Sequence, residues 1–414
     1  MVDFKSIIKE QREELESINK KENIIERIAL KDAKKYLDYP NVLVITGIRR
    51  CGKSIFSYLL ERNHKFIYVN FDDERLANLD SSNLDLILSS AYELYGDIEY
   101  IILDEIQNIK GWELFVNRLR RTKKVIITGS NSNLLSSELS THLTGRHIDV
   151  KLFPFSFKEY LMFKNFKLSS AYTTKEKSEI IKHLENYIVS GGMPETYKFG
   201  NQILVNIYED IINKDILLRY NISKPVEFKN LSKYLISNVG KEISFSKLKN
   251  ILDVGHVSTL STWTNYLENS FIFFKLNKFD FKLKTQYLAN KKFYCIDTGL
   301  ISSIGFKFSE DKGRLMENLV AIELKRRGVE NNTELFFWKE IENKEIDFLV
   351  KQENKILDLI QVTYANSEVE INSREIDNLK NCNLNCKNKI IITWNYEAEK
   401  EGIRFIPLWK FLLE

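Results

Sequence analysis

The chain has 414 residues, which is more than one ordinary hydrophobic core serves, so its length predicts two or three domains. Apolar residues make up 43% of the chain and charged residues 29%, with 5 Pro and 16 Gly, which excludes a disordered or fibrous protein. The formal net charge of +4 is small, so a nucleic-acid partner would have to bind to a local basic surface.

Residues 1–39 are predicted to be a helical lead-in that is exposed to solvent. Apolar residues recur there at helical spacing among Lys and Glu, and they are Phe4, Ile7, Ile8, Leu15 and Ile18. The segment is too charged for a signal peptide, and no apolar run in the chain approaches the length of about 18 residues that a membrane-spanning helix needs. We therefore expect no membrane segment.

Residues 40–155 contain short apolar runs that alternate with amphipathic stretches. The runs cover residues 42–45, 66–69, 100–103, 125–127 and 148–152. Runs of this kind are typical of the buried strands of a parallel sheet, with helices between them. An α/β domain is therefore predicted for this part of the chain.

A phosphate-binding motif follows the first of these strands and opens a predicted helix. The pattern G-x-x-x-x-G-K-[ST] is matched by Gly47, Ile48, Arg49, Arg50, Cys51, Gly52, Lys53 and Ser54, and Ile55 continues the helix. The two glycines allow backbone N–H groups to point at phosphates, and the helix N-terminus adds partial positive charge. The motif predicts that the segment binds ATP, since a Gly-Lys turn without function seldom has this setting.

Two residues of this motif have individual roles in the predicted site. Lys53 is expected to bridge the β- and γ-phosphates of ATP. Ser54 is expected to bind Mg²⁺ through its hydroxyl oxygen, because this cation prefers oxygen ligands.

An acidic pair, Asp104 and Glu105, ends the apolar run at 100–103. Asp104 is expected to hold the Mg²⁺ through water, and Glu105 to polarise the water that attacks the phosphate. The alternative is a surface turn with two solvated acids. Behind a phosphate loop, the pair predicts Mg²⁺-dependent ATP hydrolysis.

Two further candidates for catalysis come from the next strands. Ser130 or Asn131, after the strand at 125–127, could contact the γ-phosphate, and Asn131 is our candidate. The alternative is that these residues cap a helix, at a position before Leu134, since Ser and Asn favour such positions. Arg146 is a candidate arginine finger that one subunit supplies to its neighbour, which would require a homo-oligomer. The alternative for Arg146 is a solvated side chain or an ion pair.

Residues 156–225 are predicted to be helical, with a turn at 190–194 where Gly191, Gly192 and Pro194 interrupt the pattern. Residues 226–300 show three short helical stretches, 231–239, 246–252 and 258–269, followed by a strand at 271–276. That order predicts a winged helix-turn-helix.

The third stretch of this region could enter the major groove of double-stranded DNA. Its polar candidates for DNA contact are His256, Thr259, Ser261, Thr262 and Asn265. The helix itself has no Lys or Arg, and the basic residues lie nearby, interleaved with two aromatic residues, as Lys247, Lys249, Lys275, Lys278, Phe279, Phe281, Lys282 and Lys284. Contact with another protein is the alternative use of such a module.

Residues 301–414 are predicted to form a separate α/β domain. A helix at 315–327 precedes strands at 335–338, 346–350, 356–362 and 389–393.

Several stretches together resemble a prokaryotic family of AAA+ ATPases that is abundant in archaea. Besides the phosphate loop and the acidic pair, residues 66–72 and 153–160 carry the resemblance, and residues 190–195 and 214–216 look like the helical lid of that family. The downstream half looks like its usual partner, a winged helix joined to a restriction-endonuclease-like domain. The resemblance implies a AAA+ domain whose nucleotide-site motifs are matched by Lys53, Ser54, Asp104 and Glu105.

The nuclease-like fold to which the C-terminal domain is similar places an acid on its first helix, an Asp on one strand and a Glu-x-Lys on the next. Glu317 and Asp347 fit the first two positions. The third reads Gln361, Val362, Thr363, so an amide replaces the carboxylate and the lysine is missing, although Lys351 or Lys380 could substitute for it. We therefore expect this domain to be catalytically degenerate.

The four cysteines are scattered, and the one close pair, Cys382 and Cys386, has no histidine nearby, so no zinc site is expected. A cysteine inside the phosphate loop, Cys51, fits a reducing compartment, which points to the cytoplasm. Three functions remain open: an ATPase coupled to DNA, an ATP-dependent regulatory switch, and, ranked last, an ATP-gated nuclease.

Overall fold

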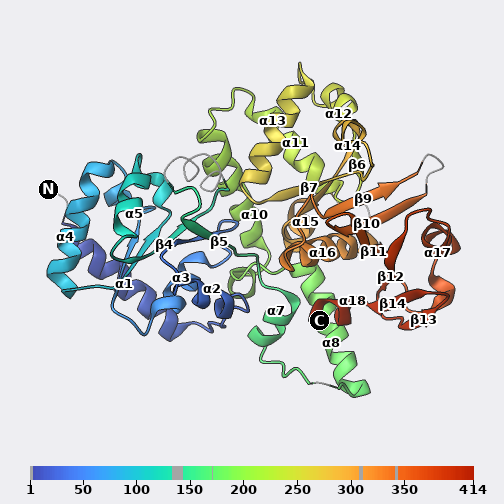
Figure 1. Ribbon diagram of the computed structural model, residues 1–414, viewed down its shortest axis with the longest axis horizontal. Helices are drawn as coiled ribbons and strands as arrows, with labels where there is room; N and C mark the ends of the chain where they lie inside the picture. Colours follow the sequence, from blue (N-terminus) through green and yellow to red (C-terminus); the bar gives the residue numbers. More distant parts are fainter. Residues whose placement is uncertain (1–2, 133–142, 170, 307–310, 341–343) are drawn as a thin grey trace. The chain divides into compact units, whose positions relative to one another are not determined.

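The computed structural model describes residues 3–132, 143–169, 171–306, 311–340 and 344–414 (Figure 1). Two compact units divide the chain. The first consists of Met1–Pro154, Met162–Asn165 and Asn269–Phe271, and the second of Phe155–Leu161, Phe166–Glu268 and Ile272–Glu414. No helix among the described residues is long and apolar enough to cross a membrane.

The first unit is built on a parallel sheet of five strands, which confirms the α/β prediction. The strands are β1 (Val42–Thr46), β2 (Phe66–Asn70), β3 (Tyr100–Asp104), β4 (Lys124–Gly129) and β5 (His147–Lys151). They lie in the order β2-β3-β4-β1-β5. Every residue of β1 and β3 is buried, as is usual for strands of a sheet covered on both faces. The connections contain helices α3 (Lys53–Glu61), α4 (Leu84–Tyr95) and α5 (Trp112–Leu119).

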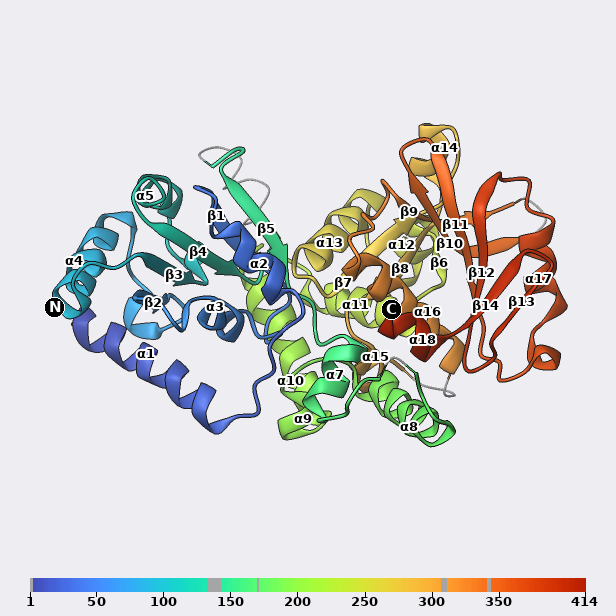
Figure 2. The same ribbon diagram turned by 60° about the horizontal axis from the view of Figure 1, so that its bottom comes forward.

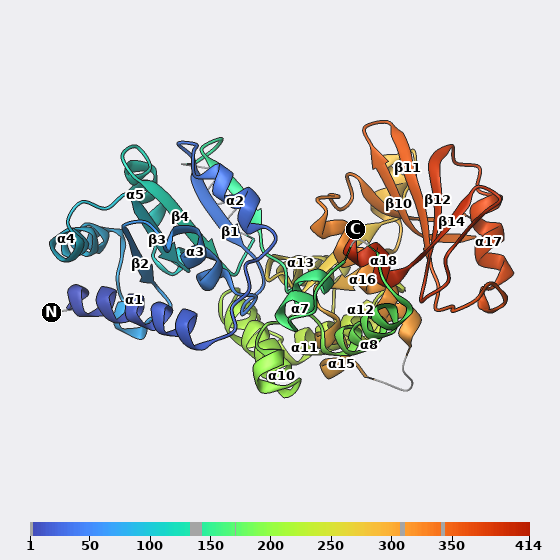
Figure 3. The ribbon, with the colours of Figure 1, turned by 90° about the horizontal axis from the view of Figure 1, so that it is seen from below.

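Helix α1 (Phe4–Lys21) contradicts the prediction of a solvated lead-in, and a second short helix, α2 (Leu30–Tyr36), follows it. Ile7 and Ile8 are buried in the same core as the strands, because the apolar stripe of α1 packs against β2 and α4 (Figure 3). Polar residues of α1 also bind the outer edge of β2. The Gln11 side chain donates to Asn70 O at 3.1 Å and accepts from Asn70 N at 2.9 Å. Nη1 of Arg12 donates to Phe66 O at 3.2 Å.

The last residue of α3, Glu61, is fully buried. Its Oε1 has no hydrogen-bond partner among the described residues, and its Oε2 lies 3.1 Å from Nδ1 of His64. Burial, followed by the charge of Glu99, raises the pKa of Glu61 from 4.5 to about 8. Between these two values the unfolded chain has released the proton that the folded chain keeps, so the free energy of unfolding falls as pH rises.

Glu61→Gln is therefore expected to flatten the pH dependence of stability and to raise stability above the folded-state pKa. Since each pKa unit corresponds to about 1.4 kcal/mol, the gain should reach a few kcal/mol. Chemical unfolding followed from about pH 5 to pH 9 measures it. Glu74→Gln, at an exposed position, is the control and should leave the profile unchanged. An equally steep profile in Glu61→Gln would contradict the assignment.

The predicted helical region from residue 156 onward is confirmed in the second unit. Its helices are α7 (Phe157–Phe163), α8 (Thr174–Ser190), α9 (Thr196–Phe199) and α10 (Gln202–Asp210), followed by a π-helical segment, Ile211–Leu218. The predicted turn after α8 requires its glycines. Gly191 has φ 71°, and a Cβ on Gly192 would lie 2.2 Å from Phe155 O.

Next in the chain come three helices and a small antiparallel sheet. The helices are α11 (Pro225–Ser237), α12 (Phe245–Ile251) and α13 (Val257–Asn269), which confirms the three predicted stretches. The strands β6 (Glu242–Ile243), β7 (Phe273–Asn277) and β8 (Lys291–Cys295) lie in the order β6-β8-β7. A short helix, α14 (Leu283–Leu288), connects β7 to β8, and α15 (Thr298–Ile304) follows.

The C-terminal part of the second unit is a mixed sheet of six strands, shown in orange and red in Figure 2. Helix α16 (Lys312–Arg326) precedes it. The four predicted strands are confirmed as β9 (Leu335–Lys339), β10 (Glu345–Gln352), β11 (Lys355–Val362) and β12 (Cys386–Thr393). Elements that were not predicted are α17 (Ser373–Lys380), β13 (Ala398–Lys400), β14 (Ile403–Pro407) and α18 (Leu408–Leu413). The strand order is β13-β14-β12-β11-β10-β9.

Candidate functional site

The predicted phosphate loop lies between the carboxyl end of β1 and the start of α3 at Lys53. Gly52 has φ 98° and Arg50 has φ 66°, so two residues of the loop adopt the left-handed conformation that curls a backbone around an anion. A Cβ on Gly47 would lie 2.1 Å from the carbonyl oxygen of Leu152. Both glycines of the motif are therefore required by the local backbone.

A buried arginine from outside the motif holds this loop in place. Nη1 of Arg27 donates to Cys51 O at 3.1 Å, and Nη2 donates to Phe153 O at 2.6 Å. Sequence reasoning missed Arg27, because a single arginine in a charged stretch carries no spacing signal. It ties the loop to the chain that follows β5.

Lys53 is the first residue of α3 and is 5% exposed. Its Nζ donates to Gly47 O at 3.2 Å and to Ile48 O at 3.4 Å, and it pairs with Oε1 of Glu105 at 3.4 Å. Burial alone would lower the pKa of Lys53, but the charges of Glu105, Cys51 and Asp104 together outweigh it, and the pKa is raised. The side chain is therefore cationic at neutral pH.

Asp104 ends β3 and is 1% exposed. Burial and then the neighbouring charge of Glu105 raise its pKa, while hydrogen bonds from the hydroxyls of Ser54, Thr128 and Tyr68 act in the opposite direction. The structure thus brings together Ser54 and Asp104, the two predicted Mg²⁺ ligands. The donors to Asp104 that the described residues supply are neutral hydroxyls.

Glu105 has φ 52°, an unusual conformation for a residue with a side chain, and such conformations concentrate at functional sites. Its N–H donates to Thr128 Oγ1 at 3.1 Å. Its carboxylate accepts from the backbone N–H and the hydroxyl of Ser130, both at 3.1 Å, and from the amide of Gln107. Burial alone would raise the pKa of Glu105, but the charge of Lys53 and the Gln107 hydrogen bond outweigh it, and the pKa is lowered. Glu105 is therefore ionised and can accept a proton.

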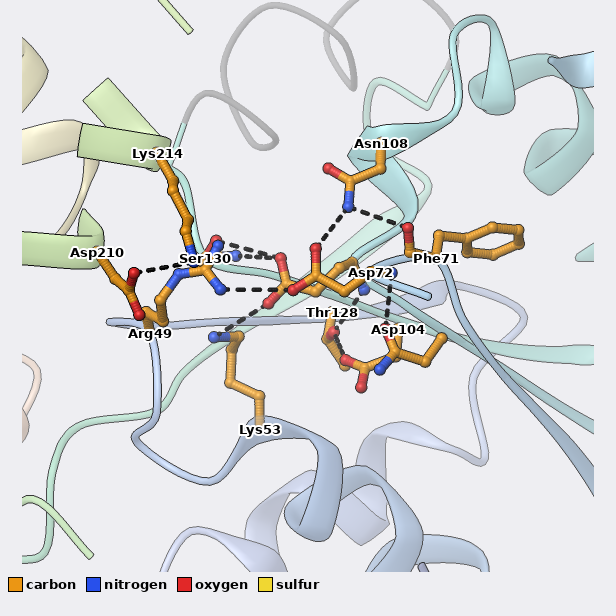
Figure 4. A network of polar contacts seen from close by, with 12 residues as sticks. Arg49, Lys53, Phe71, Asp72, Asp104, Asn108, Thr128, Ser130, Asp210 and Lys214 are labelled. Carbon is orange, nitrogen blue, oxygen red and sulfur yellow. Dashed lines mark hydrogen bonds and ion pairs between the residues drawn. The ribbon is translucent and has the colours of Figure 1, made fainter. Parts of the chain in front are cut away.

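Figure 4 shows Lys53 of α3 lying close to Asp104, Thr128 and Ser130 at the carboxyl edge of the sheet. A second polar contact lies beside them. Oδ2 of Asp72 is 3.4 Å from Nη1 of Arg49, and Asn108 Nδ2 donates to Asp72 Oδ1 at 2.8 Å (Figure 4). Besides Arg27, sequence reasoning missed the site residues Tyr68 and Gln107.

The two further candidates for catalysis, Asn131 and Arg146, lie in different parts of the first unit. Asn131 is buried one residue beyond Ser130, the residue that contacts Glu105. Leu134, before which a helix cap was the alternative prediction, lies outside the described residues. The carbonyl of Arg146 accepts from Val42 N at 2.9 Å, which puts this exposed residue at the amino end of β1.

The phosphate loop follows the carboxyl end of β1, so the length of the strand separates Arg146 from the loop of its own chain. At about 3.3 Å per residue, five residues span roughly 16 Å. A role for Arg146 in a neighbouring subunit stays a prediction.

The chain matches known domain families and is similar to other proteins along its whole length. Residues 39–161 match the family described as AAA domain, and residues 181–311 and 312–411 match domains of unknown function, DUF8612 and DUF4143. The uncharacterized protein MJ1544 of Methanocaldococcus jannaschii is 36% identical over 440 residues, which cover 100% of this chain and 96% of that protein. The chain belongs to this family of AAA-domain P-loop ATPases.

Two further proteins match the ATPase with lower sequence identity. An uncharacterized protein of Haemophilus influenzae is 33% identical over 402 residues, covering 92% of the ATPase and 96% of that relative. Among solved structures, the Walker-type ATPase PABY2304 of Pyrococcus abyssi has 16% identity and a TM-score of 0.43, and covers 68% of the ATPase and 96% of its own chain. So remote a structural likeness adds nothing to the assignment.

The polar candidates for DNA contact in the ATPase lie on α13, except His256, which comes before it. His256, Thr262 and Asn265 are exposed, whereas Thr259 and Ser261 are half-buried. The basic candidates lie on α12, on β7 and between β7 and β8, and they are Lys247, Lys249, Lys275, Lys278, Lys282 and Lys284.

The nuclease-like candidates of the ATPase also come together. Glu317 and Asp347 both contact the ammonium of Lys292, at 3.1 and 3.4 Å. The amide of Gln361 accepts from Asp347 N at 3.4 Å, and Val362 N donates to Asp347 Oδ2 at 3.0 Å. Thr363, at the position of the missing lysine, is buried.

The two lysines considered as substitutes have partners elsewhere. Lys351 Nζ donates to Glu353 O at 3.1 Å, and Lys380 pairs with Glu401. Lys292 is the cation that the structure places beside Glu317 and Asp347.

Proposed function

We propose that this ATPase uses Mg²⁺ to hydrolyse ATP and couples the reaction to double-stranded DNA. The observation that carries the proposal is the arrangement of Lys53, Asp104 and Glu105 at the carboxyl edge of one sheet. In this arrangement the buried Lys53 would bind the phosphates, the buried Asp104 would bind the metal ion, and the ionised Glu105 would activate a water molecule.

The residues around Asp104 fit Mg²⁺. A carboxylate that is 1% exposed and bonded to neutral hydroxyls gains stability from a cation, and Mg²⁺ takes oxygen ligands of the kind that Ser54 and Asp104 offer. When bound, the ion supplies positive charge that offsets the charge developing on the transferred phosphoryl group.

The chain's own side chains account for the other steps. Lys53 binds phosphate oxygens in place of the carbonyls of Gly47 and Ile48 that it holds now. Glu105, oriented by Ser130 and Gln107, accepts the proton of the attacking water. Arg146 would serve the site of an adjoining copy in a homo-oligomer.

A regulatory switch is the second candidate, favoured by the contact between Lys53 and Glu105, which keeps both catalytic charges occupied with each other. Steady-state ATP turnover with and without duplex DNA separates the two functions. Stimulation by DNA, abolished by a chelator of Mg²⁺, supports coupled hydrolysis. Turnover that stays slow with DNA supports the switch, and failure to bind ATP at all would refute both.

The surface proposed for DNA lies between β7 and β8. The order of α11, β6, α12, α13, β7 and β8 supports our inference of a winged helix-turn-helix, whose helix α13 has no Lys or Arg. The segment between β7 and β8 carries the exposed Lys282 and Lys284, with Phe281 and Leu283 exposed by 83% and 65% beside them. We propose that this segment makes the phosphate contacts.

The double variant Lys282→Glu/Lys284→Glu is expected to weaken duplex binding at every sequence. Loss of two phosphate contacts should reduce the slope of log affinity against log salt by about 2. Fluorescence anisotropy over a salt series measures both effects. Lys175→Glu/Lys177→Glu on α8 is the matched control, with the same charge change and the same spacing at exposed positions. Equal losses in the two variants would show a general charge effect and remove the proposed surface.

We also propose a cytoplasmic location for the ATPase. Its four cysteines, Cys51, Cys295, Cys382 and Cys386, are free thiols, and the first is buried in the phosphate loop. A reducing compartment keeps such thiols unoxidised.

A further inference from the structure

Three carboxylates of the second unit converge on one buried ammonium group. Lys292, on β8, is 1% exposed, and its Nζ lies 2.7 Å from Oε1 of Glu345, 3.1 Å from Oε1 of Glu317 and 3.4 Å from Oδ1 of Asp347. Glu317 comes from α16, and the other two acids come from β10. Glu345 and Asp347 are two residues apart on a strand, so they point to the same face of the sheet.

The acids are fixed by further contacts. Tyr294 OH donates to Oε1 of Glu317 at 2.7 Å, Val362 N donates to Oδ2 of Asp347, and Lys339 lies 3.5 Å from Glu345. Burial, followed by the charge of Glu317, raises the pKa of Asp347 to about 8. Carboxylates gathered in a buried place repel one another, so the cluster depends on a cation at its centre.

Two acids on a strand and one on a helix also form the kind of oxygen-rich cluster that binds divalent ions. Here the oxygens lie 2.7 to 3.4 Å from the ammonium nitrogen. Mg²⁺ would need oxygens at about 2.0–2.1 Å. Across the residues that the structure describes, no group of three or more His, Cys, Asp or Glu is arranged to hold a metal ion. The spacing suits an ammonium group.

We propose that the ammonium of Lys292 is the resident cation of this acidic site and stands where a divalent metal ion would otherwise bind. Because the cation is part of the chain, the C-terminal sheet needs no metal for its stability and offers none for chemistry. The same contact ties β8 of the small sheet to α16 and β10 of the large one. Removing the lysine should therefore create a metal site.

Mn²⁺ binding to the full-length protein tests the proposal, with electron paramagnetic resonance counting bound ions. Lys292→Ala is expected to bind one more Mn²⁺ per chain than the wild type. Its Tm should be lower than that of the wild type, and Mn²⁺ should raise it by more than it raises the Tm of the wild type. Lys292→Ala/Asp347→Asn should lose the extra ion, and Lys292→Arg, which keeps a cation, should not gain it. The phosphate loop is intact in all of these variants and contributes a constant background.

An unchanged Mn²⁺ count in a folded Lys292→Ala would overturn the proposal. Where that variant does not fold, the comparison of wild type with Asp347→Asn decides. Equal Mn²⁺ counts support a site already filled by the ammonium. One ion fewer in Asp347→Asn would show that the wild-type cluster binds metal, and the proposal would then be wrong.

Discussion

Lys53→Ala is expected to lower kcat/KM for ATP by about 100- to 1,000-fold, because the variant loses the buried cation that meets the phosphates. The side chain contacts the carbonyl of Gly47 and the carboxylate of Glu105. Steady-state kinetics of ATP hydrolysis measure the loss, and calorimetry measures the accompanying loss of ATP affinity.

Lys65→Ala is the control for this prediction, since Lys65 is an exposed lysine of the same unit. It should keep wild-type kinetics. A Lys53→Ala variant that is folded and hydrolyses ATP at the wild-type rate would remove the phosphate loop from the mechanism.

Glu105→Gln is expected to keep ATP binding and to lose turnover by roughly 100- to 10,000-fold, the range attributed to a general base. The amide has the shape of the carboxylate, but it cannot accept a proton from water. It also cannot balance the charge of Lys53, which lies 3.4 Å away, so ATP should bind the variant at least as tightly. Single-turnover kinetics and calorimetry on the same preparation separate the two effects.

Glu99→Gln is the matched control, because Glu99 directly precedes β3 and Glu105 directly follows it. The two residues therefore lie at opposite ends of one strand. Equal losses of turnover in both variants would point to damage to β3 and count against a role in catalysis. Unchanged turnover in Glu105→Gln would assign the proton transfer to another group.

Local patterns in the sequence were enough to predict the strands and the motif residues. The strands β1 and β3 are continuous runs of buried residues. Lys53 and Ser54 follow β1 in the motif, and Asp104 and Glu105 are at the end of β3. The spacing of apolar residues predicted the helix α1. It could not show that β2 and α4 cover the apolar face of this helix, because those elements lie far away in the chain. The alternating exposure along β14 spans only five residues and gave too short a signal.

The missed site residues have the same cause. Tyr68 and Thr128 contact Asp104 across 36 and 24 residues of sequence, and neither contact was predicted. They become neighbours only when β2, β3 and β4 align in register. Lys292 is likewise 25 and 55 residues away from Glu317 and Asp347. A lysine in a short strand reads as solvent-facing until its partners are known.

The hydrogen bonds from α1 to β2 also decide how the parallel sheet can assemble. Because Gln11 and Arg12 occupy polar backbone groups at both ends of this border strand, a further strand cannot add there without displacing the helix. The opposite border is β5, and Arg146 directly precedes it. A homo-oligomer, which stays a prediction, therefore cannot form by adding a strand beside β2 unless α1 is displaced.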